Sequence, residues 1–205
     1  MSSTTSRTGF ASMAFLSVGV AGYAAFVYGF LPLGGLLHPD MKTTYNSHSV
    51  GIYTHVFGAM VALLLGPWQF STRLRTSRPV LHRWMGRLYL GIGVLIGGIA
   101  GLYMAFHAFG GFVAQSGFGL LAVLWLLTGL RAYVSIREGS ITAHRRWMVR
   151  NFALTFAAVT LRIWLPGSVA SGIPFEAAYP VIAWGCWVPN LLVAELLFNR
   201  ARAAS

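Results

Sequence analysis

The residues of this sequence best suited to binding chemistry are imidazoles inside long apolar segments. His55 and His107 lie near the same end of two consecutive segments of this kind. At a rise of about 1.5 Å per residue, His55 lies about 8 Å and His107 about 3 Å below that end. Imidazole nitrogens ligate haem iron and other transition metals, so the pair predicts a haem b held from both faces or a bound metal ion. For His107, bonding to lipid headgroups or water is the alternative.

Two further histidines precede a short basic motif that occurs twice. The motif Arg-Trp-Met-x-Arg spans 83–87 and 146–150, with His82 directly before the first copy and His144 two places before the second. We refer to these two segments as the collars. The two histidines form a candidate inner cofactor site; the alternative is a basic surface that binds lipid phosphates. The collar residues assigned to this site are Arg83, Arg87, Arg146 and Arg150.

Three polar residues lie within apolar segments near the end of the chain. Arg162 either extends its side chain to the membrane surface or pairs with an anion, for which a haem propionate, a quinone oxygen and Glu176 are candidates. Asn190 and Glu195 follow in the last apolar segment, and a collar arginine is a candidate partner for Glu195. The sequence contains no phosphate-binding loop, nucleophile elbow or zinc-protease motif, so it does not predict a hydrolase.

The apolar segments that carry these residues predict an all-α membrane protein. Hydrophobic residues make up 56% and charged residues 9% of the 205 positions, which is too little charge for a soluble domain. Six segments are long enough to cross a bilayer, and they predict one polytopic transmembrane helix bundle covering residues 1–205. The predicted spans are 10–33, 50–70, 88–109, 113–135, 147–165 and 178–198. Pro166-Gly167 is expected to end the fifth span, and Cys186, the only cysteine, excludes an intramolecular disulfide.

The repeated motif predicts a repeated structure. Each collar opens an apolar segment, and Gly66 and Gly129 end the apolar segments that precede the two collars. We therefore predict a tandem repeat of helical hairpins, in which spans two and three are followed by spans four and five. Within the third span, Gly93, Gly97 and Gly101 recur every four residues, which is typical of a seam where another helix packs closely.

Basic residues are distributed unevenly between the two sides of the predicted bundle. The chain has 15 Lys and Arg but only four Asp and Glu, and six spans place both termini on one side. Thirteen of those cations fall on the side of the termini, Lys42 alone falls on the other, and Arg162 lies within a span. This asymmetry predicts a protein of the cell (inner) membrane with both termini in the cytoplasm. It also accounts for the net charge of +11 without a nucleic-acid partner, so membrane lipid is the expected partner.

Three stretches of the sequence resemble a known family. They are HRWMGRLY at 82–89, AHRRWMVRNFALTFAAVTLR at 143–162 and WVPNLLVAE at 187–195. They are similar to signatures of a bacterial family of predicted multi-span membrane proteins with a domain-of-unknown-function label, which implies no established activity. The resemblance covers the chain from about His55 onward. More distantly, a basic collar followed about one span later by His107 is similar to membrane cytochrome b and ferric-reductase-like haem proteins, which implies haem b.

Three functions from different classes fit these observations. The first is electron transfer by a haem b protein that exchanges electrons with a quinone or another redox partner, with His55 and His107 as ligands. The second is a metal-binding or assembly factor, in which Met104 and Met41 join the outer histidines to hold copper. The third is a non-redox transporter or accessory subunit whose polar residues only fix helix packing. The sequence names no substrate for any of them.

Overall fold

The computed structural model describes residues 3–35 and 38–199, and all regular structure in these residues is helical. The helices before the first collar are α1 (Ser3–Phe30), α2 (Pro39–Ser47), α3 (Ser49–Gln69) and α4 (Thr72–Ser77). A continuous stretch then consists of α5 (Pro79–Leu88), the π-helical segment η1 (Tyr89–Ile96) and α6 (Gly97–Ala105). The remaining elements are α7 (Gly111–Arg137), α8 (Ile141–Thr155), α9 (Ala157–Ala170), α10 (Phe175–Gly185), α11 (Val188–Val193) and the π-helical segment η2 (Ala194–Asn199).

Six helical stretches are long and apolar enough to cross a membrane, which confirms the predicted all-α transmembrane fold. Two of these stretches begin earlier than the sequence predicted, because α5 starts at Pro79 and α8 starts at Ile141. Both collars therefore lie inside helices rather than ahead of them. The six stretches are Thr8–Phe30, Ser49–Gln69, Pro79–Ala105, Gly111–Arg137, Ile141–Ala170 and Phe175–Leu196.

The prediction that Pro166-Gly167 ends the fifth span is wrong. Helix α9 continues to Ala170 with Pro166 in its interior. Membrane helices tolerate proline where neighbouring groups satisfy the freed backbone, and the Ser168 hydroxyl donates to the Leu165 carbonyl at 2.8 Å beside this proline. The last span is interrupted instead, since α10 ends at Gly185 and α11 begins at Val188, next to Pro189.

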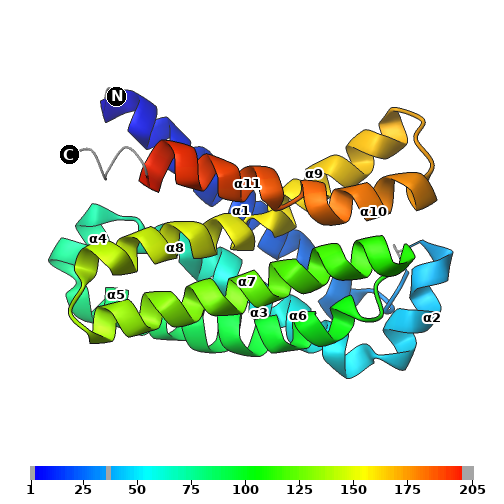
Figure 1. The fold of residues 1–205 in the computed structure, drawn as a ribbon, viewed down its shortest axis with the longest axis horizontal. Coiled ribbons are helices and arrows are strands. Elements are labelled where there is room, and N and C mark those ends of the chain that lie inside the picture. Colours follow the sequence, from blue (N-terminus) through cyan, green and yellow to red (C-terminus); the bar gives the residue numbers. More distant parts are fainter. Residues whose placement is uncertain (1–2, 36–37, 200–205) are drawn as a thin grey trace.

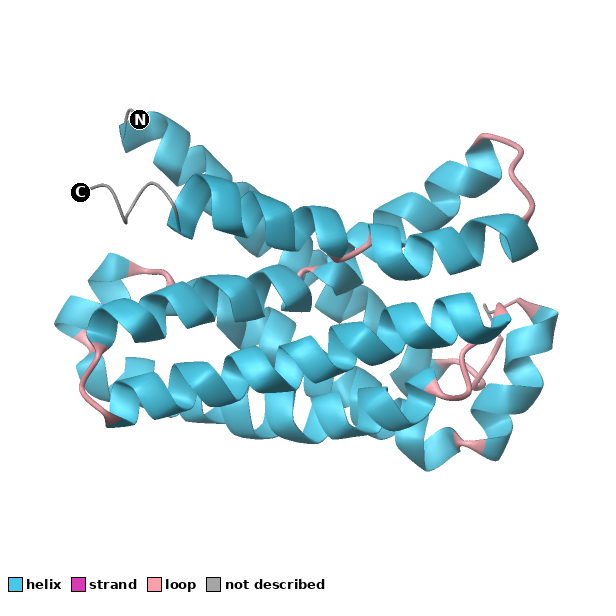
Figure 2. Ribbon diagram, in the orientation of Figure 1, coloured by secondary structure: helices cyan, strands magenta, loops and turns pink. Residues whose placement is uncertain are grey.

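The spanning helices run back and forth between two ends of the bundle (Figure 1). Helix α4, the α7–α8 turn and the start of α1 lie at one end, and α2 and the α9–α10 loop lie at the other. Loops lie mainly at these two ends, apart from the interruption between α10 and α11 (Figure 2). The end that carries α4 and the α7–α8 turn also carries both collars. We call it the inner end, and the opposite end is the outer end.

Glycines bring α3 into close contact with the helical stretch that follows the first collar. A Cβ built on Gly58 would lie 2.6 Å from the Cα of Gly97, and one built on Gly93 would lie 2.9 Å from the Cβ of Ala62. Only glycine permits such an approach of two backbones. The predicted glycine seam is therefore confirmed, and it brings the second and third spans into close backbone contact at these positions.

The two collars share one local contact. The Arg87 guanidinium lies 4.8 Å from the centre of the Trp84 ring, and the Arg150 guanidinium lies 4.4 Å from the centre of the Trp147 ring. In each copy the two residues are three positions apart on a helix, which places them on the same face. The local likeness agrees with a repeat, whereas duplication of whole hairpins stays a prediction.

Candidate functional site

A cavity of about 900 Å³ lies inside the bundle. Residues of α1, α3, α6, α7 and α9 line most of it, and α2 and α10 contribute at the outer end. The lining is mainly aliphatic and aromatic, and it includes the buried residues Trp125, Thr155 and Cys186. Its size falls in the range of pockets that enclose a whole small molecule. The polar side chains that line it include Tyr23, Tyr28, His38, Tyr45, His55, His107, Thr155, Arg162 and Tyr179.

His55 lies on the α3 wall of this cavity with its proton position fixed by the backbone. Its Nδ1 is 2.9 Å from the carbonyl oxygen of Gly97. A carbonyl oxygen only accepts, so Nδ1 carries the hydrogen and Nε2 keeps its lone pair. Gly101 lies against the same ring, since a Cβ built there would come within 2.5 Å of Nδ1. The imidazole is thus held against α6 by one edge, with Nε2 as its remaining acceptor.

Replacing Gly101 by alanine is expected to lower the free energy of unfolding by about 1–3 kcal/mol, because the added methyl group overlaps the His55 ring. The imidazole then has to leave its bond to Gly97. Gly91→Ala is the matched control, since a Cβ at Gly91 meets no atom within 4 Å. Equilibrium unfolding in detergent compares the two variants. Equal stability of both would show that His55 is not packed in this way.

Arg162 places a cation on the α9 wall of the cavity. Its Nη1 donates to the Ala158 carbonyl at 3.0 Å, and its guanidinium lies 6.0 Å from the centre of the Tyr23 ring. His55 and Tyr28 line the same cavity. Among the described residues that line the cavity there is no Asp or Glu. Arg162 therefore lies at an apolar cavity without a carboxylate to balance its charge.

Glu176, one predicted partner of Arg162, forms a different pair. Its carboxylate lies 3.4 Å from Nε2 of His38 at the outer end. The predicted partner of Glu195 is confirmed, since this carboxylate pairs with the collar residue Arg150, with Nη2 donating to Oε2 at 3.0 Å.

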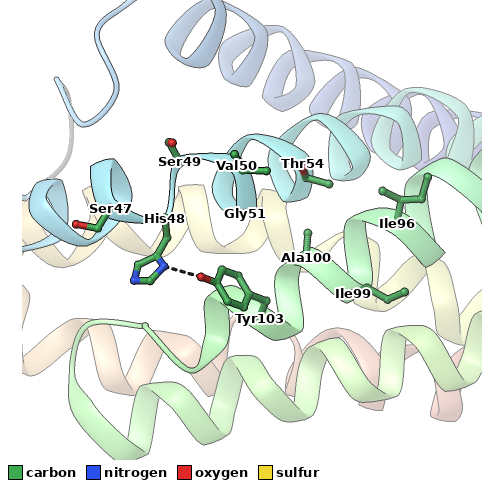
Figure 3. Close-up of a pocket in the computed structure, with 10 residues that line it drawn as sticks. All are labelled: Ser47, His48, Ser49, Val50, Gly51, Thr54, Ile96, Ile99, Ala100 and Tyr103. Carbon is green, nitrogen blue, oxygen red and sulfur yellow. Dashed lines mark hydrogen bonds between the residues drawn. The ribbon is translucent and has the colours of Figure 1, made fainter.

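His107 lies just beyond the end of α6 and contacts a histidine that the sequence analysis did not assign. The His107 and His48 ring centres are 3.8 Å apart, and Nδ1 of His107 donates to the Tyr103 carbonyl at 3.1 Å. His48 and Tyr103 line a separate outer groove of about 560 Å³ between α3 and α6 (Figure 3). His55 and His107 line the same cavity, but the described ring contacts of His107 are to His48 and Tyr103, not to His55.

The methionines of the copper hypothesis pack as apolar residues. Met104 belongs to a buried cluster with Ile52 and Val56, and Met41 belongs to another with Ala114 and Tyr179. The described part of the chain has no group of three or more His, Cys, Asp and Glu side chains that is arranged to hold a metal ion. A copper site built from both methionines thus has no support in this packing.

His82 on α5 and His144 on α8 both lie at the inner end, and a cofactor held by this pair stays a prediction. His144 donates from Nδ1 to the Ala132 carbonyl at 2.8 Å, which anchors it to α7. In the described chain, Nδ1 of His82 and Nε of Arg146 are buried without a hydrogen-bond partner. Of the other assigned arginines, Arg83 is exposed, while those at 87 and 150 stack on tryptophan.

A buried hydrogen-bond network below the cavity was missed by the sequence analysis. Tyr89 and Asn151 are both 0% exposed, and the Tyr89 hydroxyl donates to Oδ1 of Asn151 at 2.7 Å. Nδ2 of Asn151 donates to the Trp125 carbonyl at 2.8 Å and to the Thr128 hydroxyl at 2.9 Å. Thr155 accepts from the Trp125 indole at 2.9 Å. The signal available in the sequence was the occurrence of Asn and Thr inside an apolar span, where polar groups need partners.

Asn190 makes a second set of bonds at the interruption of the last span. Its Nδ2 donates to the Thr160 hydroxyl and to the Cys186 carbonyl, both at 3.0 Å, and lies 3.3 Å from the Ala153 carbonyl. These bonds connect α11 to α8 and α9 and satisfy a carbonyl at the break between α10 and α11. Asn190 therefore has a structural role at this point and does not line the cavity.

Comparison with known proteins gives one match. The model of the family described as "Predicted membrane protein (DUF2306)" matches residues 52–198. The chain belongs to this family. The DUF2306 region contains five of the six spans and includes His55, His107 and Arg162, and the match confirms the family resemblance found in the sequence. No curated protein and no solved structure matches the chain.

Proposed function

We propose that this protein binds a lipid-soluble carbonyl compound of the quinone class in the interior cavity, with Arg162 and His55 as its polar contacts. The observation that carries this proposal is the Arg162 guanidinium at an apolar cavity whose described lining has no carboxylate. A charged side chain inside a membrane span is unfavourable unless a partner compensates it. A ligand oxygen with partial or full negative charge would supply that compensation.

The two polar contacts have the donor and acceptor character that a quinone and its reduced form require. Arginine donates hydrogen bonds and cannot accept them, so it suits a quinone carbonyl oxygen. His55 has its hydrogen on Nδ1, so its Nε2 can accept the hydroxyl proton of a quinol. The aliphatic and aromatic lining then contacts the ring and its apolar substituents. In this proposal the protein holds a quinone for a redox partner in membrane electron transfer.

Haem b is the second candidate, and one observation favours it. His55 and His107 each donate Nδ1–H to a backbone carbonyl, which is the usual arrangement of an imidazole that ligates a metal through Nε2. At the level of Gly58 and Gly97, α3 and α6 are in backbone contact, so a porphyrin would not lie between these two helices there. Haem would occupy the cavity that both histidines line, with His55 as a ligand and Arg162 beside a propionate. It would supply one-electron transfer.

The test is the content of the cavity in protein purified from bacterial membranes with a mild detergent. We expect an organic extract to contain close to one quinone per chain, well above the amount in a matched detergent extract of the same membranes. We also expect the absorption spectrum of the protein to lack a Soret band. A Soret band that sharpens on dithionite reduction would show that the bound group is haem and not a quinone. The absence of both compounds would leave a non-redox transporter or accessory subunit.

We further propose that the inner end faces the cytoplasm of a bacterial cell, with both termini on that side. Eleven arginines of the described chain belong to segments at this end, against Lys42 at the other, and this asymmetry supports the orientation. Reporter fusions after Arg78 and Gly139 are expected to report a cytoplasmic location, and a fusion after Lys42 a periplasmic one. A periplasmic signal from either of the first two fusions would reverse or refute the orientation.

A further inference from the structure

Three ring side chains from different parts of the chain meet at the outer end. His48 lies between α2 and α3, Tyr103 lies on α6, and His107 follows α6. The His48 and His107 ring centres are 3.8 Å apart at an interplanar angle of 39°, and the Tyr103 ring centre is 4.9 Å from that of His107. Figure 3 shows the imidazole of His48 and the phenol of Tyr103 pointing toward one another. The imidazoles thus form a close pair where the outer groove meets the cavity.

Tyr103 forms a hydrogen bond with Nδ1 of each imidazole of this pair. Its hydroxyl lies 2.6 Å from Nδ1 of His48, and its backbone carbonyl accepts from Nδ1 of His107 at 3.1 Å. The carbonyl requires the hydrogen of His107 on Nδ1, which leaves a lone pair on Nε2. The bond between Nδ1 of His48 and the Tyr103 hydroxyl is compatible with either tautomer of His48, and the one in which Nδ1–H donates leaves a lone pair on Nε2. Neither Nε2 has a hydrogen-bond partner among the described residues, so in this tautomer of His48 both are available to a ligand.

We propose that His48 and His107 chelate one divalent transition-metal ion, of the Cu²⁺ or Zn²⁺ class, through their Nε2 atoms. Imidazole is a preferred ligand of these ions, and hydrogen-bonded Nδ1 atoms are typical of histidines that bind them. Hard cations such as Ca²⁺ and Mg²⁺ need several oxygen ligands, and no Asp or Glu belongs to this ring cluster. Water completes the coordination, so binding is weaker than at a closed four-ligand site. The bound ion connects the α2–α3 junction to the end of α6.

This proposal does not rest on the ligand proposed for the cavity, although His107 also lines that cavity. His38 pairs with Glu176 and stacks on Phe175 at the same end of the bundle. His38 and Glu176 are therefore the competing place for a metal ion at the outer end. A variant of His38 separates the two locations.

The test is Cu²⁺ titration of the full chain in detergent, with any polyhistidine tag removed, followed by electron paramagnetic resonance. We expect one Cu²⁺ per chain, with nitrogen hyperfine structure from imidazole. His48→Ala and His107→Ala should weaken binding more than Tyr103→Phe, which should weaken it about 10-fold because it removes only the hydrogen bond to His48. His38→Ala should leave the affinity unchanged.

Two results would overturn the proposal. The first is a wild-type spectrum that lacks the hyperfine structure of imidazole nitrogen. This measurement does not depend on the folding of any variant. The second is Cu²⁺ binding that survives His48→Ala or is lost in His38→Ala. Thermal unfolding of each variant shows whether it remains folded, and Tyr103→Phe, which keeps the ring and the backbone carbonyl, provides a conservative variant if His48→Ala does not fold.

Discussion

Arg162→Met is expected to reduce the quinone retained by the purified protein at least about 10-fold. Methionine keeps an unbranched apolar side chain but removes the charge and the N–H donors of Arg162. A hydrogen bond to a charged group contributes about 1.5–3 kcal/mol, which corresponds to a factor of roughly 10 to 100 in affinity. The measurement is quinone per chain after organic extraction, at equal detergent and membrane load.

Two further variants control for the loss of a charge. Arg131 is an exposed arginine at the inner end of α7, so Arg131→Met should retain quinone like the wild type. Arg162→Lys keeps the charge but has fewer hydrogen-bond donors. Its quinone content per chain should lie between those of the wild type and Arg162→Met. Equal quinone content in Arg162→Met and the wild type would show that Arg162 does not contact the ligand.

Asn151→Leu is expected to destabilise the bundle by about 2 kcal/mol, the largest effect on stability that we expect from a single polar side chain. The change removes three hydrogen bonds of a fully buried residue. Hydrogen bonds between membrane helices average roughly 0.6 kcal/mol each, and the branched leucine also has to fit a site shaped for an amide. Equilibrium unfolding of purified protein in detergent or bicelles measures the difference.

Thr128→Val is the graded control for this network. It removes one acceptor of Asn151 and preserves the shape of the side chain, so we expect a loss of only about 0.6 kcal/mol. If Asn151→Leu and Thr128→Val have the same free energy of unfolding, the network does not connect α7 and α8 as described. Because Trp125 and Thr155 also line the cavity, Asn151→Leu should lower ligand retention as well.

The sequence was sufficient to predict the spans and the contacts set by distance along a helix. Apolar length identifies each crossing without knowledge of its neighbours, and all six crossings are present. The sequence analysis did not state the cation–aromatic contacts of the collars, but they follow from a spacing of three residues on one helix. Glu195 pairs with Arg150 because it is a carboxylate at the inner end of the last span, among arginines.

Contacts between spans could not be predicted in the same way. The sequence placed His55 and His107 at similar depth, but depth does not determine which face of a helix meets which neighbour. In the structure, the Gly97 carbonyl holds His55 against α6, where Gly101 leaves room for the ring. His107 meets His48 from the α2–α3 junction instead. The course of α9 past Pro166 was also missed, because a local rule for proline does not include the surrounding membrane helices.

Photo-crosslinking with an azidoquinone tests the central proposal most directly, because it locates the ligand rather than counting it. The purified protein is labelled, digested and analysed by mass spectrometry, with excess unlabelled quinone as competitor. The proposal predicts competed labelling of peptides from α3 and α9 that contain His55 and Arg162. Labelling confined to the outer groove between α3 and α6, or labelling that unlabelled quinone does not reduce, would contradict it.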